Sequence, residues 1–218
     1  KSAKLRIPGE ELEGVLGGVD FLREVNLGNK PDIGRRCAVI GGGNVAMDVC
    51  RSAVRLGAEE TYVFYRRSEA EMPADPEEVR EAMEEGVKFR FLSAPVEIIG
   101  TDGRVSAIKI EKMELGEPDA SGRRRPVEIP GSEFEIEVDE VIMSLGTSPN
   151  PLISSTTYGL DVNRRKCIVA EEETGKTSKE GVYAGGDAVT GAATVILAMG
   201  AGKAGAKGID EYIKSKNA

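Results

Sequence analysis

A glycine-rich turn between an apolar run and a helical pattern constrains the fold of this 218-residue chain more than any other feature. Residues 37–40 are apolar throughout, as in a strand that is buried on both faces. They lead directly into Gly41, Gly42 and Gly43, and the apolar spacing of residues 44–56 predicts a helix that ends at Gly57. A strand, a glycine turn and a helix in this order are typical of a dinucleotide-binding βαβ unit.

The turn and the start of the helix match the pattern G-x-G-x-x-A. Gly41 permits the tight turn, Gly43 lets a pyrophosphate approach the backbone, and Ala46 allows the helix to pack closely on the strand. Asn44 and Val45 lie between them, where the helix N-terminus faces the phosphates. We therefore predict a dinucleotide site; the alternative is a glycine-rich turn that binds nothing.

The pair Arg66 and Arg67 indicates which dinucleotide binds. It follows the next expected strand, residues 61–65, where an NAD-binding domain offers Asp or Glu to the ribose hydroxyls. A guanidinium at this position forms charge-assisted bonds to a 2′-phosphate, so NADP is preferred over NAD. In the alternative interpretation, both arginines are solvated and pair with Glu69 and Glu71.

The order of the expected elements predicts an α/β fold with a Rossmann-like NAD(P)-binding domain. Strand, helix, strand, helix and strand are expected at residues 37–40, 44–56, 61–65, 76–85 and 87–92. The next four short strands, residues 96–99, 105–113, 127–129 and 134–138, have no helix between them. An antiparallel meander is therefore expected in place of a crossover helix, before residues 140–146 return to the parallel sheet.

The last third of the chain contains a second glycine-rich turn, Gly185-Gly186-Asp187, after an expected strand at residues 182–184. Asp187 can accept hydrogen bonds from a polyol such as a ribityl chain, although this tripeptide is equally typical of a turn with a helix cap. A long helix is expected from residue 193 to about residue 215. It contains four glycines, which the close approach of another backbone or of a ligand would explain.

Charge and missing residue types exclude several classes of function. The net charge of −8 disfavours a nucleic-acid surface, and no apolar run approaches the ~20 residues of a membrane span. The chain has no histidine, and its three cysteines form no CxxC motif, so we expect neither a metal site nor a dithiol redox centre. Widely spaced, reduced cysteines are typical of a cytoplasmic protein.

Taken in order, these motifs resemble the small (beta) subunit of NADPH-dependent glutamate synthase and its relatives. The resemblance is carried by residues 41–48, 65–68, 71–74, 145–150 and 183–202, and it covers essentially the whole chain. It implies a flavoprotein with two dinucleotide-binding domains, in which NADPH reduces FAD and electrons pass through iron–sulfur clusters to a partner subunit. Because hydride transfer from nicotinamide to flavin needs orientation more than a protein acid or base, we predict no catalytic side chain.

The resemblance also implies roles for individual residues. The NADPH pyrophosphate loop corresponds to Gly41, Gly42, Gly43, Asn44, Val45 and Ala46, and the 2′-phosphate clamp corresponds to Arg66 and Arg67. The turn near the nicotinamide corresponds to Gly146. The C-terminal part of the FAD site corresponds to Gly186, Asp187, Ala193, Thr194 and Val195.

The family's cysteine-rich N-terminal segment and its first G-x-G-x-x-G half do not occur here, so the chain resembles a C-terminal fragment. We expect residues 1–31 to be a connector from a missing FAD domain, 32–147 the NADPH domain, and 148–218 the C-terminal part of the FAD domain. The implied partners are the missing FAD and iron–sulfur region and a large glutamate synthase-type or ferredoxin-linked subunit. Alone, the fragment is expected to bind NADPH without turnover.

Two other functions stay open, as does the final electron acceptor. One is a non-catalytic dinucleotide sensor, and the other is a partner-binding module that uses the acidic surface or the meander of residues 96–138. Thioredoxin reductases share the plan of two dinucleotide domains and, by family resemblance, carry a redox disulfide. Because this chain has no CxxC motif, we do not expect it to reduce disulfides.

Overall fold

The computed structural model describes residues 2–120, 122–147 and 149–217, which form two compact units. One unit is Ser2–Gly146, and the other contains the described residues from Thr147 onward.

A five-stranded parallel sheet forms the centre of the first unit, with the strand order β1-β9-β2-β3-β4. The strands are β1 Val15–Gly17, β2 Arg36–Ile40, β3 Glu60–Phe64, β4 Lys88–Arg90 and β9 Glu140–Met143. From β2 the chain moves outward through β3 to β4, and it then returns to the other side of β2 as β9. The sheet therefore has a switch point between β2 and β9, which is where open α/β sheets bind ligands.

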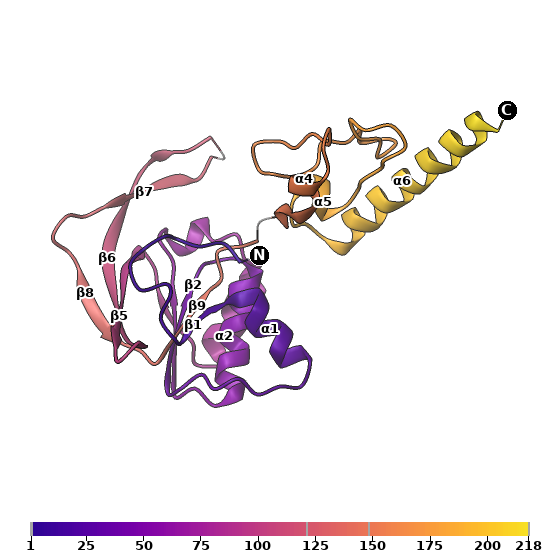
Figure 1. Cartoon of the computed structure of the whole chain (residues 1–218). Helices are drawn as coiled ribbons and strands as arrows, with labels where there is room; N and C mark the ends of the chain where they lie inside the picture. The colour runs from indigo at the N-terminus through magenta and orange to yellow at the C-terminus, as the bar shows by residue number, and fades with distance from the viewer. Residues whose placement is uncertain (1, 121, 148, 218) are drawn as a thin grey trace. The chain divides into compact units, whose positions relative to one another are not determined.

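Helices cover one face of this sheet, and they are α1 Gly18–Asn26, α2 Asn44–Leu56 and α3 Pro76–Glu84. Figure 1 shows α1 and α2 side by side on this face. Along β2, Cys37 and Val39 belong to the helix-side core, whereas Ala38 and Ile40 belong to the core on the opposite face. Side chains alternate between the faces of a strand, so burial of both faces explains the unbroken apolar run.

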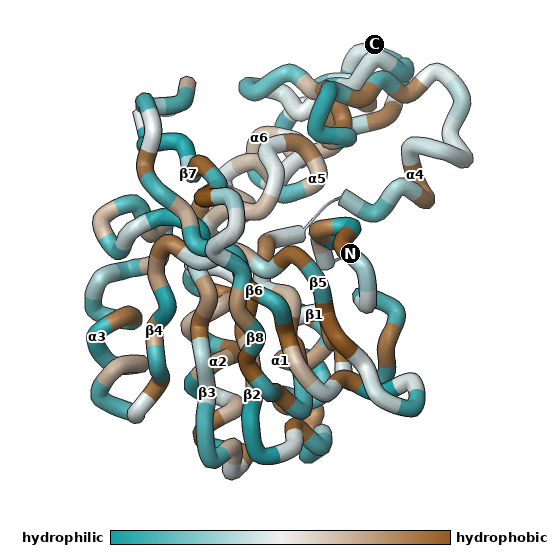
Figure 2. The backbone as a smooth tube through the Cα atoms, turned by 90° about the vertical axis from the view of Figure 1, so that its left-hand side faces the viewer, coloured by the Kyte–Doolittle hydropathy of each residue, from teal (hydrophilic) through white to brown (hydrophobic). Residues whose placement is uncertain are grey.

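An antiparallel sheet covers the opposite face (Figure 1). Its strands are β5 Ser93–Thr101, β6 Arg104–Pro118, β7 Arg124–Glu128 and β8 Phe134–Glu137, and β6 pairs with the other three. Figure 2 shows hydrophobic stretches along the parallel strands and β5, whereas α3 is largely hydrophilic. The meander occupies the place of a crossover helix between β4 and β9, which confirms the predicted fold class.

The N-terminal residues, expected to form a connector, supply an edge strand and a helix to the first unit. Strand β1 pairs in parallel with β9, and Phe21 of α1 is 2% exposed in the helix-side core. The amphipathic pattern of residues 19–25 predicts α1. A strand of three residues is too short for alternation to reveal it.

The second unit contains three helices in its described part, α4 Pro151–Thr156, α5 Asp187–Thr190 and α6 Val195–Lys216. The strand expected at residues 182–184 is reduced to a single bridge, from Tyr183 to Lys176. It is hydrogen-bonded to the short loop of residues 174–177, where the Thr177 N–H donates to the Val182 carbonyl and the Gly175 carbonyl accepts from the Ala184 N–H. None of the described helices has both the length and the apolar character that crossing a membrane requires.

Candidate dinucleotide-binding site

The loop after β2 is fixed between its neighbouring strands. The Gly41 N–H donates to the Phe64 carbonyl at 3.1 Å, and the Ser144 N–H donates to the Ile40 carbonyl at 2.8 Å. Gly41 has a φ of +143°, and a Cβ built on it would approach the Ser144 carbonyl oxygen closer than 3.0 Å. Both the backbone conformation and the packing therefore require glycine at position 41.

Gly43 differs from Gly41, because its surroundings are open. It is the N-cap of α2 with a φ of −99°, and the nearest atom to a Cβ there would be Pro73 Cγ at 4.0 Å. The adjoining first turn of α2 has N–H groups without partners inside the helix, at the positive end of the helix dipole. On the inner side Ala46 is fully buried, and Val45 packs against the helix-side core. The result is an open cradle for an anion at the start of α2.

Residues 65–75, here called the flanking segment, connect the glycine loop after β2 with the arginine pair after β3. The Tyr65 ring would stand 2.5 Å from a Cβ on Gly42, and its hydroxyl donates to the Glu71 carbonyl at 2.7 Å. At the other end of the segment, the Asp75 N–H donates to Asn44 Oδ1 at 2.9 Å. The segment is thus attached to the glycine loop at both ends.

The two predicted arginines have different environments. Arg66 is exposed and forms no ion pair with any residue that the structure describes. Arg67 is 6% exposed; its Nη2 lies 2.6 Å from Asp119 Oδ2, and its Nε donates to the Arg124 carbonyl at 2.8 Å. Within the described residues, neither arginine pairs with the nearby glutamates of the flanking segment, which was the alternative interpretation. A 2′-phosphate contact by Arg67 stays a prediction.

Gly146 follows β9 at the same edge of the sheet. It is exposed with a φ of +94°, no atom of another described residue of the first unit lies within 4 Å of a Cβ built on it, and its carbonyl accepts from the Ala3 N–H at 3.0 Å. Gly41, Arg66 and Gly146 therefore follow three neighbouring strands, β2, β3 and β9, at their carboxyl ends. An extended dinucleotide can contact all three along this edge.

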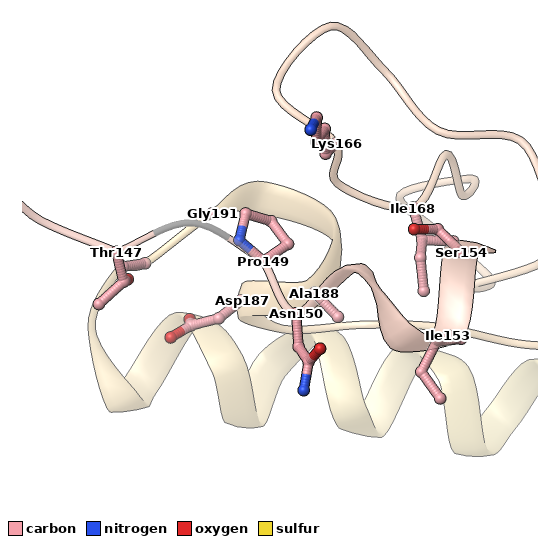
Figure 3. Close-up of a pocket in the computed structure, with 11 residues that line it drawn as sticks. Thr147, Pro149, Asn150, Ile153, Ser154, Lys166, Ile168, Asp187, Ala188 and Gly191 are labelled. Atoms are coloured by element: carbon pink, nitrogen blue, oxygen red, sulfur yellow. The ribbon is translucent and has the colours of Figure 1, made fainter. Parts of the chain in front are cut away.

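The second unit has a pocket of about 360 Å³ beside Asp187 (Figure 3). Asp187 and Ala188 begin α5, and Gly186 before them is buried with a φ of +68°. The pocket is lined by Thr147, Pro149, Asn150, Ile153, Ser154, Lys166, Ile168, Asp187, Ala188, Gly191 and Ala192. Of the predicted residues in this unit, Asp187 lines the pocket, whereas the exposed Ala193, Thr194 and Val195 do not.

Sequence reasoning missed Asp119 and Ser144, which shape the site without belonging to a motif. Asp119 lies 52 residues after its partner Arg67, and Ser144 meets the glycine loop only because β9 pairs with β2. No local pattern marks either residue.

The cysteines do not take part in the site. Cys37, Cys50 and Cys167 are free and buried. Burial raises the pKa of the Cys37 thiol and raises that of Cys50 to about 12, so both stay protonated and unreactive. Among the described residues, no group of three cysteine or acidic side chains is placed to hold a metal ion.

Comparison with known sequences gives close matches over nearly the whole chain. The model of the pyridine nucleotide-disulphide oxidoreductase family matches residues 1–203. The NADP(+)-dependent formate dehydrogenase subunit beta of Moorella thermoacetica is 44% identical over 98% of this chain and 30% of that protein. The glutamate synthase [NADPH] small chain of Halomonas elongata is 40% identical over 94% of this chain and 46% of that protein. The chain thus spans less than half of these relatives, and the predicted resemblance is confirmed.

Solved structures show the same fold at lower identity. Mycobacterium tuberculosis FprA in complex with NADPH has a TM-score of 0.78 and 23% identity, over 99% of this chain and 61% of that chain. Thioredoxin reductase from T. acidophilum has a TM-score of 0.74 and 22% identity, over 99% of this chain and 63% of that chain.

Proposed function

Because the chain belongs to the pyridine nucleotide-disulphide oxidoreductase family, we propose that its first unit binds NADPH at the carboxyl edge of the parallel sheet. One observation carries this proposal: the open cradle beside Gly43 and the exposed guanidinium of Arg66, which has no ion-pair partner among the described residues, follow adjacent strands of this edge. The cradle fits a pyrophosphate, since it combines unpaired N–H groups with a helix dipole and lacks a side chain in the way.

Arg66 supplies the selectivity for the phosphorylated cofactor. It is the exposed cation at the end of β3, where NAD-binding domains carry a carboxylate. Its guanidinium can bind a 2′-phosphate through two parallel hydrogen bonds. Gly146 is assigned to the nicotinamide end of the same edge, because it follows β9, the strand beside the switch point.

The second unit is proposed to form the C-terminal part of an FAD site. Its pocket combines the carboxylate of Asp187 with the polar groups of Asn150 and Lys166 and the apolar side chains of Ile153 and Ile168 (Figure 3). Such a mixture suits a polyol chain attached to a planar ring. With both cofactors bound, NADPH would supply a hydride that FAD would accept, and the residues of this chain would bind and orient the two cofactors.

The whole protein is proposed to be an oxidoreductase similar to the glutamate synthase small subunit. Relatives of this chain are named as subunits, which supports a multi-subunit assembly. Its proposed partners are an N-terminal FAD and iron–sulfur region of the same protein and a larger glutamate synthase-type or ferredoxin-linked subunit. The free, buried cysteines support a cytoplasmic location.

Titration calorimetry of the 218-residue chain with NADPH and with NADH tests the first-unit site. We expect the chain to bind NADPH more tightly than NADH, and we expect Arg66→Glu to weaken the binding of NADPH far more than the binding of NADH. Arg23→Glu is a matched control with the same change of charge, because Arg23 on α1 is also exposed and makes no ion pair with a described residue. An equal loss of affinity for NADPH and NADH in Arg66→Glu would show that Arg66 does not contact the 2′-phosphate.

A further inference from the structure

Strand β6 crosses the first unit and is fixed at both ends. At the amino edge of the parallel sheet, Arg104 Nη2 lies 2.9 Å from Glu140 Oε1 on β9. In the middle, Ile108 and Ile110 are fully buried in the core on the meander side. Asp119, directly after β6, reaches Arg67 beyond the carboxyl end of β3, as described above. The hairpin that β6 forms with β7, described at residues 111–120 and 122–128, is therefore a firm support next to the arginine pair.

Arg67 is held by this hairpin and by the connection between β4 and β5. Its guanidinium is bound by the Asp119 carboxylate and by the Arg124 carbonyl. Its own carbonyl accepts from the Leu92 N–H at 3.0 Å, and the Leu92 carbonyl accepts from the Met113 N–H on β6 at 2.8 Å. A buried guanidinium without a counter-charge is costly, so the Asp119 carboxylate is what allows Arg67 to stay inside.

Arg66 therefore lies between two fixed neighbours. On one side, Tyr65 packs on Gly42 and donates its hydroxyl to Glu71. On the other side, Arg67 is anchored to the hairpin. With both neighbours fixed, the backbone of Arg66 has little freedom, and its side chain is directed to solvent at the edge where the cofactor is proposed to bind.

We propose that Asp119 is a specificity-determining positioning residue: by holding Arg67 inside the protein, the β6–β7 hairpin fixes Arg66 for the 2′-phosphate of NADPH. The inference rests on the proposed NADPH site. It replaces the predicted clamp, in which both arginines contact the 2′-phosphate, with two different tasks: Arg66 contacts the ligand, and Arg67 supports Arg66. A preorganised guanidinium loses less entropy on binding, and only a ligand that contacts it benefits.

The test is the ratio of the dissociation constants for NADH and NADPH, measured by calorimetry on the 218-residue chain. In Asp119→Asn we expect this ratio to fall about fivefold, with NADH binding unchanged. Glu117→Gln is the matched control, because Glu117 is exposed, lies two residues away on β6, and loses the same charge without touching Arg67. In an Arg66→Gln background, D119N should have no further effect on the ratio.

The outcomes separate this inference from the proposed function. A wild-type chain without a preference for NADPH overturns both. A wild-type preference that D119N leaves unchanged or increases, in a protein with unaltered circular dichroism, overturns the inference alone.

A second measurement needs no variant and applies even where D119N fails to fold. In nitrogen-15 spectra of the wild-type chain, saturation with NADPH should shift the Arg66 side-chain Nε–H signal and leave that of Arg67 in place. A larger shift for Arg67 would show that Arg67 itself binds the phosphate and would overturn the assignment.

Discussion

The carbonyl oxygen of Ser144 occupies the place where a side chain at position 41 would begin. Gly41 belongs to the loop after β2, and Ser144 directly follows β9, so the two residues meet at the switch point of the sheet. The loop is held close to β9 at this point, whereas two residues later, at Gly43, it opens to solvent.

This contrast predicts different results for two alanine substitutions. Gly41→Ala introduces a strained φ and a clash with backbone, so we expect the free energy of unfolding to fall by more than about 2 kcal/mol. Gly43→Ala keeps an ordinary φ and fills only open space, and it should cost at most about 1 kcal/mol as an altered N-cap. Both substitutions should lower the affinity for NADPH at least tenfold, which corresponds to about 1.4 kcal/mol of binding free energy. Urea unfolding and calorimetry measure the two effects; a G43A protein that binds NADPH normally would contradict the cradle.

Glu140 predicts a pH dependence of stability. It is 3% exposed, and burial raises its pKa from 4.5 to about 7, even though the Arg104 guanidinium opposes the shift. Because the folded state binds the proton more tightly than the unfolded state, this residue stabilises the fold at low pH. The stabilisation is full below the unfolded pKa and is lost as the pH rises to about 7.

Urea unfolding gives the free energy of unfolding of the wild type and of Glu140→Gln at each pH. The wild-type value minus the Glu140→Gln value should decrease by up to about 3 kcal/mol between about pH 5 and about pH 8. Glu13→Gln serves as a control, since Glu13 is the exposed second partner of Arg104, with a side chain that is 75% accessible. The corresponding difference for E13Q should stay flat. A flat difference for E140Q as well would contradict the burial argument.

The glycines of α6 predict opposite effects of the same substitution. Gly202 is exposed, and within the described part of the chain a Cβ on Gly202 would lie within 4 Å of no neighbouring atom, so Gly202→Ala should stabilise the helix by about 0.5–1 kcal/mol. Gly208 is buried, and a Cβ there would overlap the Thr174 carbonyl oxygen, so Gly208→Ala should destabilise the unit. Hydrogen exchange of the α6 amides reports both changes; protection that moves in the same direction in the two variants would be inconsistent with this packing.

The parts of the fold with a local signal were predictable from the sequence. The helix expected at residues 44–56 is α2 Asn44–Leu56, because apolar periodicity marks its length and Gly57, with a φ of +104°, ends it. The meander was predictable because its turns and alternating strands are also local. Strand β1 was not, since three residues carry no period, and its place beside β9 depends on a pairing of distant segments.

In the candidate site, too, the features with a local sequence signal were predictable, and those that depend on distant segments were not. The need for glycine at position 41 is visible in the sequence, because the motif is contiguous. The burial of Arg67 is not visible, because it depends on Asp119 in a hairpin far along the chain. The α6 glycines were expected to face a close neighbour, and the outcome is mixed: Gly208 lies against Thr174, whereas Gly200 and Gly202 face open space. Helical spacing alone does not tell which side of a helix is covered.

The most direct test of the central claim compares two ligands that differ only in the 2′-phosphate, namely adenosine 2′,5′-bisphosphate and adenosine 5′-monophosphate. Calorimetric titration of the 218-residue chain should show the bisphosphate binding roughly tenfold to a hundredfold more tightly, as expected for a charge-assisted contact of about 1.5–3 kcal/mol. Arg66→Gln should abolish that difference. Equal affinity of the wild-type chain for the two ligands would contradict the account that this edge of the sheet selects NADPH through Arg66.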